Sequence, residues 1–408
     1  MKNLFKKPGI YCALLLITSL AGCGGGGGGY SAATPMATTG TLNVSLTDAP
    51  ACGFDAVNVT VTKVRINQSG SAADTDAGWT DITLNPALKI NLLSLTNGTL
   101  EALGQTPLAA GHYSQIRLLL DPNTGTGLAN SVVPTGSTAE VSLDTPSAVQ
   151  SGIKLINEFD VAAGQRVDIV LDFDACKSIV TKGNGKYALK PVIKVVPAIL
   201  NGIDGFVSTA ALGNHVAVSA QQNGTIISST TPNATTGEFL LTRLAPGNYD
   251  VVITADNRAA TVISGVPVAS TTSTTVVSSS AVPINLLTSA TLPGSISGAV
   301  TLSPVSATEV AYLAAKQSFA AGPTVTIKYQ GADLLSGAYT LSNLPTVAPQ
   351  LGLYSATLPI VFTTPAGTLP GTAKYRVEAS ATGYTTKANA SVDISAANQS
   401  GIDFTLTP

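Results

Sequence analysis

The chain has 408 residues, a formal net charge of -2, and charged side chains at only 11% of positions, against roughly 25% in an average protein. It has no basic patch and no basic run interleaved with aromatic residues, which excludes nucleic acid as a partner. Hydrophobic residues make up 44% of the chain, and it has a single tryptophan. Abundant Thr, Ser, Ala, Val and Gly, which combine β-branched residues with turn formers, predict an all-β protein.

The first 22 residues have the pattern of a signal peptide. Lys2, Lys6 and Lys7 form a positively charged region, and residues 10–20 form an apolar run of 11 residues. A membrane-spanning helix needs roughly 20 apolar residues, so the run predicts a cleaved signal for residues 1–22. No later window of the sequence reaches a spanning length.

Cys23 follows this run in the string LAGC. The string resembles the lipobox of bacterial lipoproteins, which implies that Cys23 becomes the first residue of the mature chain and carries acyl chains. Two or more acyl chains anchor a protein stably to a membrane. Residues 23–40 are rich in glycine and predict a flexible tether. Gly24, where an aspartate would resemble an inner-membrane retention signal, favours the outer membrane. An ordinary secretory signal with a chance cysteine is the alternative.

Cys52 and Cys176 remain in the predicted mature chain beside the lipidated cysteine. An even pair of cysteines in an oxidising compartment predicts a disulfide, which would bind the start of the first domain to its end. A loop of this length contributes about 4–5 kcal/mol on the chain-entropy model. Two free buried thiols are the alternative.

Residues 41–198 predict the first β-sandwich. Alternating apolar and polar residues mark its main strands, at 41–50, 54–66, 113–121, 166–174 and 190–196. Within 54–66 the alternation changes phase after Val61, which predicts a β-bulge. Residues 92–103 fit either a short strand or one or two helical turns.

The motifs of this region keep a characteristic order. They are VSLTDAP, FDAVNVTVTKVRI, INLLSLTNG, GHYSQIRLLLD, SGIKL and LDFDACKSIV followed by GKYALKPVIKV. Together they resemble the family of uncharacterised bacterial domains called DUF4382. The resemblance implies a β-sandwich on a surface or periplasmic lipoprotein, and it implies no activity.

Residues 201–283 and 292–408 predict two further sandwiches related by a weak repeat. GIDGFVS aligns with SISGAVT, and TTGEFLLTRLAPGNYDVVITA aligns with LSGAYTLSNLP, which is followed by an insertion at 346–373. These segments resemble the carboxypeptidase regulatory-like and starch-binding-like β-sandwiches. The fold class is therefore all-β, with three consecutive sandwiches of prealbumin or immunoglobulin type behind a lipidated tether.

The sequence offers few residues for catalysis. Its two histidines, His112 and His215, fall in different predicted domains, and no nucleophile elbow, HExxH helix or phosphate loop occurs. Asp172 and Asp174 are predicted on one strand face, where carboxylates could bind calcium; solvated outer-face aspartates and turn caps are the alternative. Trp79 is predicted as a structural residue, with sugar stacking as the alternative.

We therefore expect a non-enzymatic lipoprotein of the outer membrane or cell surface that presents β-sandwich modules for structural or binding work. It would face either the periplasm or the exterior. Membrane lipid, through the anchor, and a surface glycan or envelope protein are its expected partners. It is expected to need no cofactor beyond the calcium alternative. A carbohydrate-binding protein that uses the starch-binding-like modules is the competing function.

Overall fold

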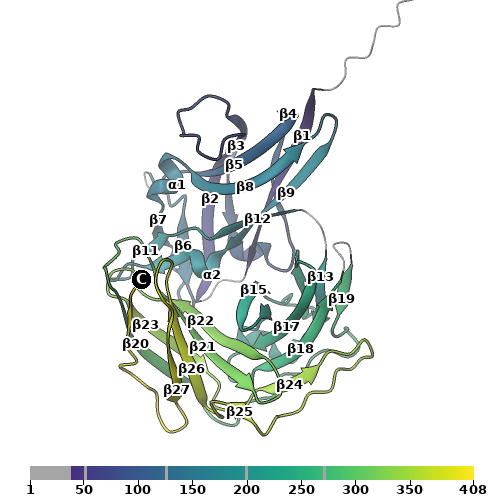
Figure 1. Ribbon diagram of the computed structural model, residues 1–408, viewed down its shortest axis with the longest axis vertical. Coiled ribbons are helices and arrows are strands. Elements are labelled where there is room, and N and C mark those ends of the chain that lie inside the picture. The colour runs from purple at the N-terminus through teal and green to yellow at the C-terminus, as the bar shows by residue number, and fades with distance from the viewer. Residues whose placement is uncertain (1–37, 50–52, 125–126, 198–200, 270–272) are drawn as a thin grey trace, which may run out of the picture. The chain divides into compact units, whose positions relative to one another are not determined.

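The computed structural model describes residues 38–49, 53–124, 127–197, 201–269 and 273–408. The signal peptide, Cys23, nearly all of the tether and Cys52 lie outside these ranges. Ala37–Pro408 form one compact unit. Within the described ranges no helix is both long and apolar enough to cross a membrane. As the composition predicts, these ranges consist mainly of β-strands (Figure 1).

Residues 39–197 form the first sandwich from two sheets. The smaller sheet has four strands, in the order β12 (Ile193–Pro197), β9 (Arg166–Asp174), β1 (Thr39–Ala49) and β4 (Glu101–Ala109). The larger sheet has eight strands: β10 (Ile179–Thr181), β11 (Tyr187–Leu189), β7 (Val141–Asp144), β6 (Ser131–Pro134), β2 (Phe54–Asn67), β5 (Gly111–Leu120) and β8 (Ile153–Val161) in this order, with β3 (Thr80–Asn91) paired to β2. β12 and β8 are thus terminal strands of the two sheets.

Short helices lie between some of these strands. They are η1 (Leu92–Leu95), α1 (Pro146–Gln150) and α2 (Ala175–Ser178). The ambiguous segment after β3 begins with η1, a single 3-10 turn, because the Asn91 side chain accepts a hydrogen bond from Leu93 N at 3.2 Å and caps it.

The phase change in the second strand is a β-bulge, as predicted. The register of β2 against both β3 and β5 shifts between Val61 and Lys63. Side chains alternate between the two faces of a strand, so an extra residue is needed to return Val64 and Ile66 to the core face. Both are fully buried.

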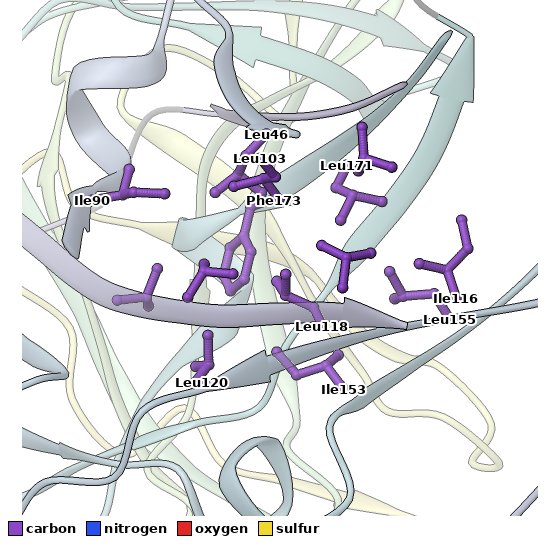
Figure 2. Close-up of a cluster of buried hydrophobic side chains, with 14 of the residues drawn as sticks. Leu46, Ile90, Leu103, Ile116, Leu118, Leu120, Ile153, Leu155, Leu171 and Phe173 are labelled. Carbon is purple, nitrogen blue, oxygen red and sulfur yellow. The ribbon is translucent and has the colours of Figure 1, made fainter. Parts of the chain in front are cut away.

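The core of the first sandwich lies between its two sheets. Ile169, Leu171 and Phe173 alternate along β9 and are buried in it, as the sequence pattern predicts. Figure 2 shows Leu171 and Phe173 in one cluster with Leu118 of β5 and Leu155 of β8. This core fixes the positions of β8, which borders the site described below, and of β9, with which the second border strand, β12, is paired.

The second sandwich is built mainly from residues 202–276. Its small sheet has the order β16 (Glu238–Thr242), β13 (Gly202–Phe206) and β19 (Thr274–Val276). Its large sheet has the order β15 (Thr225–Thr230), β14 (Ala217–Gln222), β17 (Gly247–Thr254), β18 (Thr261–Val268) and β24 (Gln350–Leu353). The short helix η2 (Thr209–Asn214) connects the two sheets.

The third sandwich occupies residues 294–406. Its small sheet has the order β23 (Ala338–Leu344), β20 (Gly294–Leu302) and β28 (Phe404–Leu406). Its large sheet has the order β22 (Thr324–Gly331), β21 (Tyr312–Phe319), β26 (Lys374–Ser380) and β27 (Lys387–Asp393), and β25 (Thr368–Leu369) pairs with β21.

The second and third sandwiches share one topology. In each small sheet the central strand pairs antiparallel with one neighbour and parallel with the other. Two turn glycines also correspond. Gly237 and Gly337 have φ of 74° and 67°, and an added Cβ would lie 2.0 Å from Val207 O and 2.1 Å from Val300 O, respectively. Only glycine fits such a turn without displacing backbone.

The insertion in the third sandwich reaches into the second. Residues 350–363, which we call the strap, begin with β24, and β24 pairs in parallel with β18. Gln350 N donates to Ala260 O at 2.8 Å. Ile360 is 7% exposed and belongs to the core of the second sandwich, against which Phe362 also packs. The fifth strand of that sheet therefore comes from a distant part of the sequence.

A loop residue of the first sandwich forms several hydrogen bonds with the second. Asn97, at φ 60°, donates from its backbone N to Thr230 Oγ1 at 2.8 Å and from Nδ2 to Glu238 O at 3.2 Å. Its Oδ1 accepts a hydrogen bond from Leu240 N. The side chain thus pairs with the free edge of β16 as a short strand would.

Two further sets of polar contacts join the sandwiches. Between the first and third, Leu334 N donates to Thr181 O at 3.0 Å and Gly183 N donates to Asp333 Oδ2 at 2.8 Å. Between the second and third, Thr326 Oγ1 donates to Gly224 O at 2.6 Å. Because these bonds involve backbone groups, they constrain the relative position of whole strands.

Candidate functional site

A groove of about 1840 Å³ at the edge of the first sandwich is a candidate site. Residues of α1 and β8 line one side of it, and β12 with the segment before it lines the other. Tips of the third sandwich, at 307–309 and 334–335, complete the wall. The groove is open to solvent, so an extended molecule could enter it without any movement of the strands.

The groove is bordered by the terminal strands of both sheets of the first sandwich. β8 pairs with β5, and β12 pairs with β9; no other described strand pairs with either. Each therefore presents an edge of backbone N–H and C=O groups that no neighbouring strand uses. This placement is not visible in the sequence because β8 and β12 are separated by β9, α2 and two further strands.

The side chains of β8 divide between core and groove. Ile153 and Leu155 are buried in the core, whereas Lys154 is exposed and Ile156 is 61% exposed. Leu335, which is 70% exposed, lines the groove together with Ile156. Ile156 is apolar at a position of the strand where the alternation of side chains would place a polar residue, and this is a sequence signal that could have indicated an exposed apolar surface.

The groove is lined by more positive than negative side chains. Four lysines and two carboxylates line it: Lys154, Lys182, Lys190, Lys194, Asp144 and Glu309. Two of the lysines form ion pairs, Lys182 with Asp144 at 2.7 Å and Lys190 with Glu309 at 3.1 Å. The surplus charge is positive, which favours an acidic ligand.

The Lys190–Glu309 pair also ties the first sandwich to the third. Burial alone would raise the pKa of Glu309, but hydrogen bonds from Lys190 and Thr382 outweigh burial and hold the pKa below its ordinary value. The carboxylate is therefore ionised at neutral pH, and the wall of the groove is fixed there.

A buried arginine holds the residue that follows α1, at the edge of the groove. Arg117 donates from Nη1 to Ser151 O at 2.8 Å and from Nη2 to Ala72 O at 2.7 Å. The Trp79 ring lies 4.9 Å from this guanidinium and 4.7 Å from that of Arg65. Trp79 Nε1 donates to Ala73 O at 2.9 Å. These contacts give Trp79 the structural role that the sequence favoured.

A smaller pocket of about 270 Å³ lies where all three sandwiches contribute residues. Lys316 pairs with Glu378, and Lys177 pairs with Asp174 at 2.7 Å. Burial would raise the pKa of Glu378, but hydrogen bonds from Lys316 and Arg376 keep it below the ordinary value. Because these charges neutralise each other, the pocket holds ion pairs and offers no free base. The sequence did not predict it.

Asp174, one of the two predicted calcium ligands, is engaged in other contacts. Asp174 caps α2 by accepting from Lys177 N at 3.1 Å and also binds Lys177 Nζ. Burial raises the pKa of Asp172, and repulsion from Asp174 adds to the effect. Within the described ranges no group of three or more His, Cys, Asp or Glu side chains is placed to hold a metal ion. Asp174 therefore has a capping role, and Asp172 is half-buried.

The two histidines do not meet. His112 Nδ1 lies 2.9 Å from Asp160 Oδ1 in the first sandwich, and His215 Nδ1 lies 2.7 Å from Asp256 Oδ2 in the second. Both pairs are exposed. Neither pair includes a hydroxyl or thiol nucleophile.

The disulfide stays a prediction, because Cys52 lies outside the described residues. The chain that leads to each cysteine is placed suitably. Ala49 pairs with Asp174 in the parallel register of β1 and β9, and Ala175 N donates to Asp48 Oδ1 at 3.0 Å. Cys176 follows Ala175 directly, within α2.

Comparison with known families identifies the first sandwich. Residues 39–191 match the family described as "Domain of unknown function (DUF4382)". The resemblance seen in the sequence motifs is thereby confirmed for this part of the chain. No curated protein matches the sequence.

Solved structures give only distant likenesses. The Bacillus anthracis TIE protein is 10% identical, with a TM-score of 0.17, over 91% of this chain and 50% of its own. This chain thus spans about half the length of that protein. The Corynebacterium diphtheriae major pilin SpaA is 12% identical, with a TM-score of 0.19, over 90% of this chain and 100% of its own. The Bacillus cereus major pilin BcpA is 13% identical, with a TM-score of 0.15, over 90% and 98%. Scores this low support no argument about function.

Proposed function

We propose that this protein is a non-enzymatic lipoprotein of the cell envelope, anchored in the outer membrane through Cys23, whose joined β-sandwiches present a binding groove. The observation that carries the proposal is the groove between β8 and β12, a preformed surface with two strand edges. The order of lysines, apolar run, LAGC string and glycine-rich segment supports the anchor. The groove is the binding surface, and the sandwiches hold it rigid.

Fractionation of cells that express Cys23→Ser tests the anchor. The variant is expected to lose palmitate labelling and to leave the membrane fraction, because the acyl chains provide the membrane affinity. Cys12→Ser, inside the predicted signal, is the matched control and should behave as the unaltered protein. A Cys23→Ser variant that still labels with palmitate and sediments with membranes refutes the lipoprotein proposal.

Carbohydrate binding by the second and third sandwiches is the competing proposal. Their shared topology favours it, since it fits the resemblance to carboxypeptidase regulatory-like and starch-binding-like modules. The aromatic residues oppose it. Tyr249, Tyr339 and Tyr375 are buried and donate their hydroxyls to backbone carbonyls, so their rings are not available to stack on sugars. Saturable binding of residues 37–408 to an oligosaccharide on a glycan array would favour this second function.

A further inference from the structure

We propose that the groove binds an acidic peptide in extended conformation, which adds as a further strand to the free edge of β8. The inference rests on the proposed function, for which it names the class of partner. It follows from three properties of the groove: an unused strand edge, exposed apolar side chains beside it, and a surplus of positive charge.

The strand edge supplies the main-chain recognition. β8 has nine residues and pairs along one side with β5, while the side that faces the groove pairs with no described strand. A peptide that adds to such an edge gains a ladder of backbone hydrogen bonds, and these contribute affinity without regard to its sequence. Residues of β12 also line the groove, and the peptide is proposed to pair with β8 alone.

The side chains of the groove supply the selectivity for apolar residues. In an added strand, alternate side chains of the peptide point in the same direction as those of its neighbour. Ile156 projects on the solvent side of β8, and Leu335 lies on the third sandwich at the same groove. Apolar side chains at alternate positions of the peptide would cover both residues and remove them from water.

The lysines supply the selectivity for charge. After Lys182 and Lys190 are paired with Asp144 and Glu309, Lys154 remains without an ion partner among the described residues. The Lys194 ammonium donates to Ile227 O at 2.8 Å, and Lys194 lies opposite Asp172 in the register of β12 and β9, so Lys154 carries the surplus charge. A peptide with carboxylates at its non-apolar positions complements this surplus, whereas a basic peptide is repelled.

A lysine on a terminal strand can also have a purely protective role. Charged side chains on free edges prevent strands of other molecules from pairing there. If Lys154 serves only this purpose, the edge rejects every peptide, acidic or not. The experiment below distinguishes the two roles.

The probe is a fluorescein-labelled nonapeptide, acetyl-Glu-Val-Thr-Val-Glu-Val-Thr-Val-Glu-amide, titrated with residues 37–408 and followed by fluorescence anisotropy. We expect saturable 1:1 binding that weakens as salt is added. The peptide with lysine in place of each glutamate should bind about tenfold more weakly or less. A peptide with the same side chains but alternate N-methylated amides should lose binding, because it cannot form the backbone ladder.

The matched variants locate the site. Ile156→Asn removes an exposed apolar side chain of β8, and Lys154→Glu reverses a charge on the same strand; each should weaken binding of the acidic peptide by about tenfold or more. Leu353→Asn is the control, since Leu353 is a 70% exposed apolar residue on β24, far along the chain from β8. The control variant should bind the acidic peptide as tightly as the unaltered protein does. Circular dichroism verifies that all three variants fold.

Several results would overturn the inference. They are no saturable binding of the acidic peptide, equal binding of the N-methylated peptide, equal effects of Leu353→Asn and Ile156→Asn, or an oligosaccharide that competes for the groove in place of any peptide. Failure here leaves the membrane-anchor test with Cys23→Ser unaffected, so the two proposals fail separately.

Discussion

Gln221 and Thr326 are joined by a reciprocal pair of hydrogen bonds across the boundary of the second and third sandwiches. Gln221 Nε2 donates to Thr326 O at 2.9 Å, and Thr326 N donates to Gln221 Oε1 at 2.8 Å. Both residues are buried. The side-chain amide replaces a neighbouring strand for one residue of β22 and leaves its backbone fully paired.

Gln221→Leu should destabilise the chain. The substitution leaves the N–H and C=O of Thr326 buried without partners, and each such group costs about 1–3 kcal/mol. Urea denaturation of residues 37–408 measures the free energy of unfolding. Gln222→Leu is the control, because Gln222 makes one exposed hydrogen bond, to Asn248 O at 3.1 Å. Equal stability of the two variants would contradict the proposed coupling.

Ile360→Ala should weaken the second sandwich although residue 360 belongs to the sequence range of the third. Ile360 is buried in the core of the second sandwich, and truncation of a buried isoleucine costs about 2–5 kcal/mol. Hydrogen exchange should rise along β18, whose edge the strap covers.

Val361→Ala provides the matched control, since Val361 is adjacent in sequence and 75% exposed. It should leave both stability and exchange within the range of surface substitutions, about 0.5 kcal/mol. Increased exchange confined to β20–β28 in Ile360→Ala would show that the strap stabilises only its own sandwich.

Asp172→Asn should raise the melting temperature at pH 7. Burial raises the pKa of Asp172, and Asp174 adds repulsion, while Lys194 and Arg243 act in the opposite direction without cancelling the rise. A raised pKa means that the contribution of this group to stability is fully present below the ordinary value of 3.8 and is lost as pH rises through the folded-state pKa. The gain from Asp172→Asn should therefore vanish as pH falls towards 3.8 and below.

Thermal melts between pH 3 and 8 measure this dependence for Asp172→Asn. Asp168→Asn, on the same strand, is the control. Addition of calcium or of a chelator should leave the melting temperature of the unaltered chain unchanged. If calcium stabilises the chain and Asp172→Asn abolishes that effect, the metal interpretation of Asp172 and Asp174 is restored.

The Cys52–Cys176 disulfide should leave no reactive thiol in residues 37–408 when the chain is unfolded without reductant. Reduction should lower the stability of the first sandwich by up to about 4–5 kcal/mol and should leave the other two less affected. Thiol labelling with mass detection is the measurement. Two labelled cysteines per unreduced chain would disprove the pairing.

The strand pattern of the first sandwich could be predicted because one face of each strand meets the core. The alternate spacing of Ile169, Leu171 and Phe173 predicts β9, and the phase change after Val61 predicts the bulge. The same reasoning placed Asp172 on an outer, solvated face. That placement missed its partial burial, because alternation within a strand carries no information about what packs on its other face. Val170, two residues earlier in the strand, is fully buried.

The groove and the strap could not be predicted for a related reason. The groove depends on which strands end each sheet, and sheet order is a property of the whole topology. The strap was seen only as an insertion. The sequence of residues 350–363 does not indicate which sandwich buries Ile360, because an apolar residue in an insertion could pack equally well against its own sandwich.

The strap also sets an order on biosynthesis. A chain that emerges from a ribosome or a translocation channel from its N-terminus exposes residues 202–276 well before residue 350 appears. Until then the second sheet ends at β18, with an open edge and an unfilled part of its core. Open edges of this kind invite pairing with other nascent chains. The second sandwich thus matures only with the third, and a message truncated between them yields an incomplete domain prone to aggregation.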